Sequence, residues 1–241
     1  MAARAAGAPV RRVMVTKASG VRRGLSSTAK VVLAVDTSRY PVDLLDGANG
    51  VRMINRCHAQ MREQGFVALP GFLNSDAAAA MLDEALALET QGGGFYSTEA
   101  HSIHLDDEWS SSALAGLPET HPRCVQQSSS KLLFAADQLD SASSPLRDLY
   151  DWPPMLSFVR SALDEPSLHL SADPMGRCYL NLFGAGDQLG WHFDNSTFSV
   201  SLILQPSEGG GAFEFAPASR CAVEVHSPEH RGTTRKRTER H

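Results

Sequence analysis

The sequence lacks the features that mark several large classes of protein. Its four cysteines are scattered, with no Cys-x-x-Cys pair, which favours free thiols in a reducing compartment over a disulfide framework. No apolar run approaches the roughly 18 residues that cross a membrane, so a membrane protein is not expected. Acidic residues are missing from residues 1–35, which contain seven basic ones.

Charge is divided unevenly along the 241 residues, whose net charge is −5. Residues 36–225 hold 10 of the 22 basic residues and 25 of the 27 acidic ones, a net of −15. Such an acidic body argues against nucleic acid as a partner. Since 42% of the chain is hydrophobic, we expect one globular domain with a substantial core at residues 36–225.

Both ends of the chain differ from this body. Residues 1–35 are rich in Arg, Ala and Ser, the composition of an organelle transit peptide, and we expect mitochondrial import, with a plastid or the cytoplasm as alternatives. A disordered basic tail without a targeting role is the other interpretation. Residues 226–241, with five basic and two acidic residues and no apolar periodicity, are also expected to be disordered.

Local patterns predict helices in the first part of the body and short strands in the second. Apolar spacing, caps and prolines predict helices over residues 51–65, 76–90, 145–150 and from 153 onward. The cap of the second helix is Asn74 or Ser75. Alternating or short apolar runs predict strands over residues 66–69, 131–135, 168–170, 178–186, 198–205 and 213–215. Residues 95–130 are predicted to be mainly loop.

The stretch 190–215 carries a histidine and an aspartate with a single residue between them, His192 and Asp194. On a strand, residues i and i+2 point to the same face, so the two side chains can face one cavity while Phe193 points away. An imidazole and a carboxylate with open positions opposite suit a non-haem Fe(II) centre. The neighbouring short strands and the glycine turn at 209–211 predict the mouth of a barrel.

Residues 178–217 resemble the iron(II)- and 2-oxoglutarate-dependent oxygenases. The phrases LGWHFD, SLILQ and GGGAFEF look like the branch that acts on free amino acids and similar small molecules, and weaker similarity reaches back to Gly65. The resemblance implies an α+β fold whose core is a double-stranded β-helix, the jelly-roll or cupin-like barrel, with N-terminal helices buttressing it.

The same resemblance implies a function and a site. It predicts a dioxygenase that hydroxylates a small molecule such as an amino acid, with Fe(II) as cofactor and 2-oxoglutarate as co-substrate. His192 and Asp194 would be the catalytic metal ligands, and Asn181 would hydrogen-bond 2-oxoglutarate. Alternatively, Asn181 pairs with loop backbone. Related halogenases have Gly or Ala in place of the carboxylate ligand, so Asp194 favours hydroxylation over halogenation.

The sequence departs from the family after Phe215. The family has a second metal-binding His, followed about ten residues later by an Arg or Lys that holds 2-oxoglutarate. Too few residues lie between Phe215 and His226 for the remaining strands. The tail contains two sets of residues with similar spacing: His226 with Arg235 or Arg237, and His230 with Arg240. We therefore expect an incomplete barrel with an unpaired sheet edge, through truncation or a changed reading frame near Arg220.

Two alternatives to an active oxygenase follow from this departure. One is a catalytically inactive remnant of the same fold, and the other is a cupin-like binding module that uses the same strands. Other histidines carry less signal. His101 and His104 are three residues apart, a spacing that suits a metal pair only on a helix, and no helix is expected there. His169 is expected to be a strand residue without a chemical role.

Overall fold

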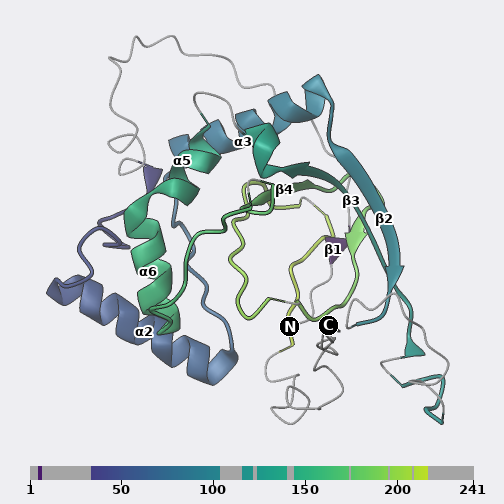
Figure 1. Ribbon diagram of the computed structural model, residues 1–241, viewed down its shortest axis with the longest axis horizontal. Coiled ribbons are helices and arrows are strands. Elements are labelled where there is room, and N and C mark those ends of the chain that lie inside the picture. Colours follow the sequence, from purple (N-terminus) through teal and green to yellow (C-terminus); the bar gives the residue numbers. More distant parts are fainter. Residues whose placement is uncertain are drawn as a thin grey trace, which may run out of the picture.

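The computed structural model describes residues 5–6, 34–103, 116–121, 124–139, 144–173, 175–194, 196–207 and 209–216. They form a mixed α+β arrangement with helices beside an open antiparallel sheet (Figure 1). The predicted tail at 226–241, most of residues 1–35 and His104 lie outside the described residues. In the part of the chain that is described, no helix is long and apolar enough to cross a bilayer.

The predicted helices are confirmed. They are α2 (Ala48–Gln64), α3 (Ser75–Gln91), α5 (Pro145–Asp151) and α6 (Pro153–Leu163), and a short 3-10 turn, η2, covers Ala136–Leu139. Gly65 ends α2 with a φ of 74°, where a glycine avoids the strain that other residues meet. The Asn74 side chain accepts the N–H of Ala77 at 2.9 Å and so caps α3.

The helices pack in pairs around the larger apolar core. Helix α2 packs against α6, and α3 packs against α5. This core draws on both helix pairs and on the segment before α2: Val35, Tyr40, Val42, Met53, Cys57, Phe72, Met81, Leu149, Trp152, Phe158 and Ala162. The helical layer therefore has its own interior.

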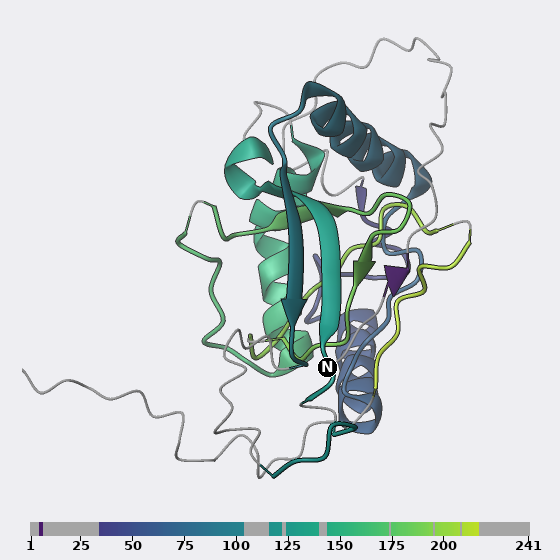
Figure 2. The same cartoon turned by 90° about the vertical axis from the view of Figure 1, so that its right-hand side faces the viewer.

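The sheet consists of β1 (Ala5–Ala6), β2 (Phe95–His101), β3 (Gln127–Ala135), β4 (Tyr179–Leu182) and β5 (Gln188–Leu189). Its order is β1-β5-β3-β2, and β4 pairs with β3 beside β5. Figure 2 shows β2 and β3 running side by side along their lengths. The outer edge of β2 has no partner strand among the described residues.

Four strand predictions are wrong. Residues 66–69, 168–170, 198–205 and 213–215 contain no strand in the structure. Alternation sets which side chains share a face, but a strand also needs a neighbouring backbone to complete its hydrogen bonds, and no described strand pairs with these segments. Within 198–205, Val200 and Ile203 are each 66% exposed, while Leu204 packs against the core.

The expectation that residues 95–130 are mainly loop is wrong at both ends. Phe95–His101 and the first residues of Gln127–Ala135 pair in register as β2 and β3, with Phe95 opposite Leu133 and His101 opposite Gln127. Serines 128–130, which fall in the predicted loop, belong to β3, and Ser129 is buried. Short polar side chains such as these are typical of loops. Pairing with β2 outweighs that preference here, and β2 is distant in sequence.

Candidate functional site

The chain after β4 follows one edge of β3 and leads to the predicted site. Leu182 pairs with Leu132, and Gln188 pairs with Ser130, so residues 183–187 loop out of the ladder. Beyond β5 the same path continues, because the N–H of Trp191 donates to the Gln127 side chain at 3.2 Å. The segment 190–194 therefore lies where β3 begins.

Asp187 holds the looped-out residues against the sheet. Its carboxylate is buried and accepts the hydroxyl protons of Tyr96 at 2.6 Å and Ser130 at 2.7 Å, and the N–H of Gly184 at 2.8 Å. Burial by itself raises the pKa of Asp187, but the three hydrogen bonds outweigh it and the pKa falls below 3.8. Asp187 thus fixes where β5 starts, and with it the approach to His192.

Gly190 is required by a close backbone approach. A Cβ at this position would lie 2.8 Å from the carbonyl oxygen of Ser128, too near for any side chain. Its N–H donates to Ser129 Oγ at 3.0 Å, and its carbonyl oxygen lies 2.8 Å from His192 Nδ1. A carbonyl oxygen can only accept, so Nδ1 carries a proton and Nε2 is the ring nitrogen left to face other groups.

His192 and Asp194 come together as predicted, although they lie in an extended loop and not on a strand. His192 Nε2 is 3.1 Å from Asp194 Oδ1, and Ser199 donates to Asp194 Oδ2 at 2.6 Å. His192 is buried, while the Asp194 side chain is 38% exposed. The Asp194 carboxylate raises the pKa of His192, and the His192 hydrogen bond lowers the pKa of Asp194 to about 2.

Two further residues that sequence reasoning did not assign to the site support this pair. His101 is buried with both ring nitrogens engaged: Nδ1 is 2.7 Å from the Ser102 carbonyl oxygen, and Nε2 is 2.7 Å from Ser129 Oγ. Its ring meets the His192 ring edge-on at a centroid distance of 6.2 Å. Ser129 accepts from Gly190 and donates to His101, so it joins the end of β2 to the carbonyl that orients His192.

Asn181 does not join the pair directly. It lies on β4 opposite Leu133, four residues along β3 from Ser129, or about 13 Å. It is exposed, and its side chain has no hydrogen-bond partner among the described residues, so pairing of its amide with loop backbone is not observed. Tyr179 shares its face and is 55% exposed. His169 lies in a loop, where its Nδ1 is 3.2 Å from Arg160 Nη2.

The donor set fits part of a metal centre. An imidazole nitrogen and a carboxylate are the two ligand types that the 2-His-1-carboxylate site of non-haem Fe(II) uses, and His192 Nε2, which a metal ion would bind in place of its proton, faces Asp194. Within the described residues, no group of three His, Cys, Asp or Glu side chains could hold a metal ion. His101 does not supply the third position, because both of its nitrogens are engaged elsewhere.

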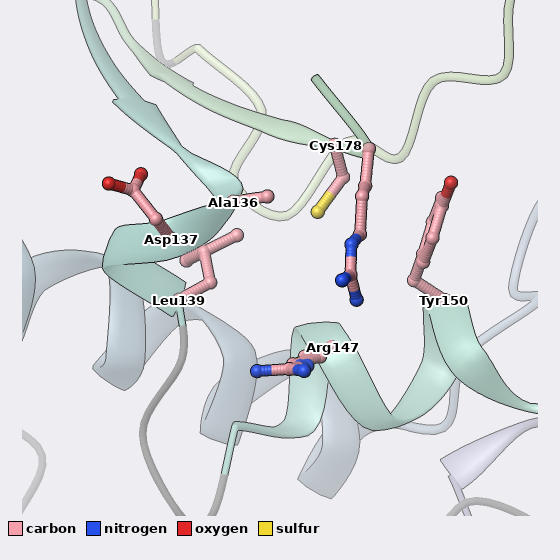
Figure 3. Close-up of a pocket in the computed structure, with 7 residues that line it drawn as sticks. Ala136, Asp137, Leu139, Arg147, Tyr150 and Cys178 are labelled. Carbon is pink, nitrogen blue, oxygen red and sulfur yellow. The ribbon is translucent and has the colours of Figure 1, made fainter. Parts of the chain in front are cut away.

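A separate small cavity lies at the other end of β3. Its volume is about 60 Å³, and Figure 3 shows Arg147, Tyr150 and Cys178 around it, with the Asp137 carboxylate directed away. Arg147 pairs with Asp151 at 3.2 Å. Burial raises the pKa of the Cys178 thiol, which makes it a poor nucleophile. Asp151 also lies 4.0 Å from Arg177 Nη1, and the buried Arg177 Nε has no hydrogen-bond partner among the described residues.

Comparison with known proteins adds no relative. No family model, no curated protein and no solved structure matches the chain. The chemistry assigned to it therefore rests on the residues of the site.

Proposed function

We propose that this chain is an Fe(II)- and 2-oxoglutarate-dependent dioxygenase that hydroxylates a small molecule such as an amino acid, on a jelly-roll core of which the open sheet is a part. The observation that carries the proposal is the geometry of His192. Its Nδ1–H is fixed by the Gly190 carbonyl, and its Nε2 faces the Asp194 carboxylate. Metal-binding histidines are commonly oriented by such a hydrogen bond on the other ring nitrogen.

His192 Nε2 and Asp194 would hold the metal ion. With 2-oxoglutarate, Fe(II) supplies the activation of oxygen for oxidising a C–H bond. The chain's own contribution is positioning: Gly190 selects the tautomer, and Ser199 orients the carboxylate through its second oxygen. Since Asp194 keeps a negative carboxylate where a halide would bind, the expected outcome is hydroxylation and not halogenation.

An inactive protein of the same fold is the second candidate. The observation that favours it is that the described residues supply two ligands and not three. We accordingly expect this chain to bind Fe(II) weakly and to turn over little 2-oxoglutarate unless a third ligand comes from outside those residues. Full activity that His226→Ala abolishes would show that the tail supplies it.

Metal titration of the purified full chain tests the proposal. Co(II) absorption or Mn(II) electron spin resonance should detect one site that is lost in His192→Ala and weakened at least tenfold in Asp194→Asn. His169→Ala is the matched control, because His169 is exposed and its ring contacts Arg160. Succinate formation separates the two candidates: the active enzyme makes it in a His192-dependent way, and the inactive protein does not. Unchanged metal binding in His192→Ala would refute the site.

A further inference from the structure

Arg177, which lies just before β4, has a buried hydrogen-bond donor that no described residue satisfies. Its guanidinium group donates no hydrogen bond within the part of the chain that the structure describes, and its Nε is buried without a partner. Asp151 Oδ1 lies 4.0 Å from Arg177 Nη1, which is too far for a hydrogen bond. A buried donor without an acceptor costs free energy, and nearly all such donors in proteins have one. An acceptor at Arg177 Nε is therefore expected.

The small cavity at the Ala135 end of β3 has room for such an acceptor. Its volume is about 60 Å³, and Arg177 lines it together with Arg147 and Tyr150 of α5. One water molecule needs about 10–15 Å³, so the cavity is larger than a single water requires, yet it is far smaller than the roughly 300 Å³ of sites for drug-sized ligands. The Arg177 side chain is 30% exposed, so the cavity is open to solvent. A ligand of a few atoms therefore fits beside Arg177.

The charges around the cavity favour an anion with a single negative charge. Two guanidinium groups line it, and the carboxylate of Asp137 in the lining is directed away (Figure 3). Outside the lining, Asp151 pairs with Arg147 at 3.2 Å, and Glu84 accepts the N–H of Leu146 at the start of α5 at 3.3 Å. Water would satisfy Nε without offsetting the remaining positive charge. A monoanion offsets it, whereas a dianion would exceed it.

The rest of the lining is mainly apolar. It includes Ala136 and Leu139 of η2, and Figure 3 shows the Cys178 side chain directed toward the cavity from the other side. A carboxylate matches the planar fork of an arginine with two parallel hydrogen bonds, and a short hydrocarbon chain matches the apolar wall. Phosphate and sulfate offer oxygens on every side and would place some of them against Ala136 and Leu139.

We infer that this cavity binds a short-chain monocarboxylate. The two carboxylate oxygens accept from Arg177 Nε and from one of its terminal nitrogens, and the carbon chain lies against Ala136 and Leu139. The inference goes beyond the proposed function and does not rest on it, because His192 lies near the Gln127 end of β3 and the cavity lies at the Ala135 end.

Protection of the Cys178 thiol in the full chain tests the inference. Iodoacetamide alkylation is followed by mass spectrometry of the Cys178 peptide over a propionate series, with sodium chloride keeping the ionic strength constant. Propionate should slow alkylation of Cys178 in a saturable way, because the bound ligand covers the thiol, and should leave Cys124, which does not line the cavity, unaffected. Propionamide has the same shape without the charge and should not protect.

Two variants should change propionate binding in opposite directions. Arg177→Gln should weaken it at least about tenfold, because the charge-assisted hydrogen bonds are lost. Arg62→Gln is the control, since it removes the same charge from an exposed position on α2. Asp151→Asn should strengthen binding severalfold, because it raises the positive charge beside the cavity. Circular dichroism checks the fold of each variant, and a gain in affinity cannot come from a loss of fold.

The outcomes that would overturn the inference are distinct. Absence of saturable protection would mean that the cavity holds water only. Protection by sulfate or phosphate and not by propionate would refute the monocarboxylate assignment. Equal protection in the wild type and Arg177→Gln would refute the role of Arg177. Metal binding at His192 is measured separately, so failure of either idea leaves the other standing.

Discussion

The two ends of β3 are held in different ways. At the Ala135 end, Phe134 is fully buried among Ala85, Leu139 and Leu180, so apolar burial holds the strand. At the Gln127 end, Ser129 is buried among hydrogen-bonding groups that connect His101 to Gly190. Apolar burial is non-directional and supplies stability, whereas hydrogen bonds fix atoms at defined positions. The end that carries the proposed metal ligands is the one built from directional contacts.

Removing the Phe134 side chain should have the largest effect. We expect Phe134→Ala to lower the free energy of unfolding by about 3–5 kcal/mol, because it leaves a cavity in a packed cluster. Phe95→Ala is the matched control on the neighbouring strand, since Phe95 is 69% exposed and should cost under about 1 kcal/mol. Urea denaturation of both variants measures the difference. Equal losses would mean that the Ala135 end is not held by burial.

Replacing Ser129 at the polar Gln127 end of β3 should lower the free energy of unfolding less than Phe134→Ala does. It should, however, displace the groups that orient His192. Ser129→Ala leaves His101 Nε2 and the Gly190 N–H without their partner, so we expect a loss of about 1–3 kcal/mol. Ser128→Ala is the control, because Ser128 is exposed on the same strand. Metal affinity should fall about tenfold or more in Ser129→Ala alone, because Gly190, whose carbonyl orients His192, loses the hydrogen bond that its N–H donates to Ser129. If both serine variants bind metal equally, the link through Ser129 does not orient His192.

The helices of the fold could be predicted from the sequence because their signals are local. Gly65, Asn74 and Pro153 mark helix ends through conformational or capping preferences that act within a few residues. The strands could not be predicted as well. The serines of β3 pair with β2, about thirty residues earlier, and the alternating run 198–205 lacks a partner. A strand depends on what lies beside it, and single-sequence patterns do not contain that information.

The same distinction applies to the site. His192 and Asp194 are two residues apart, so their meeting could be predicted from chain geometry alone, even though the strand assumed for them is absent. The contact of Ser129 with Gly190 joins residues 61 positions apart. A signal was present in the alternation of polar residues Ser97, Glu99 and His101, which share one strand face. Assigning these residues to the site required the register of β2 against β3, which the sequence alone does not give.

The smallest expected effect is the pH dependence of the metal-free protein. The pKa of His192 is raised above 6.5, so its contribution to stability is complete below that pH and is lost as the pH rises through the folded-state pKa. The pKa of Asp194 is lowered from 3.8 to about 2, so its contribution is present above pH 3.8 and is lost as the pH falls toward 2. The pair therefore stabilises the protein most between these limits.

Partial exposure of Asp194 limits the size of this effect, since solvent screens exposed ion pairs to well under about 1 kcal/mol. Melting temperatures measured with EDTA from pH 3 to pH 9 should show a shallow maximum near pH 5, and Asp194→Asn should flatten the part of it that depends on His192. Asp173→Asn is the control, because that exposed carboxylate has no histidine partner among the described residues. A maximum that persists unchanged in Asp194→Asn would show that the titrations of His192 and Asp194 are not coupled as the distance between them indicates.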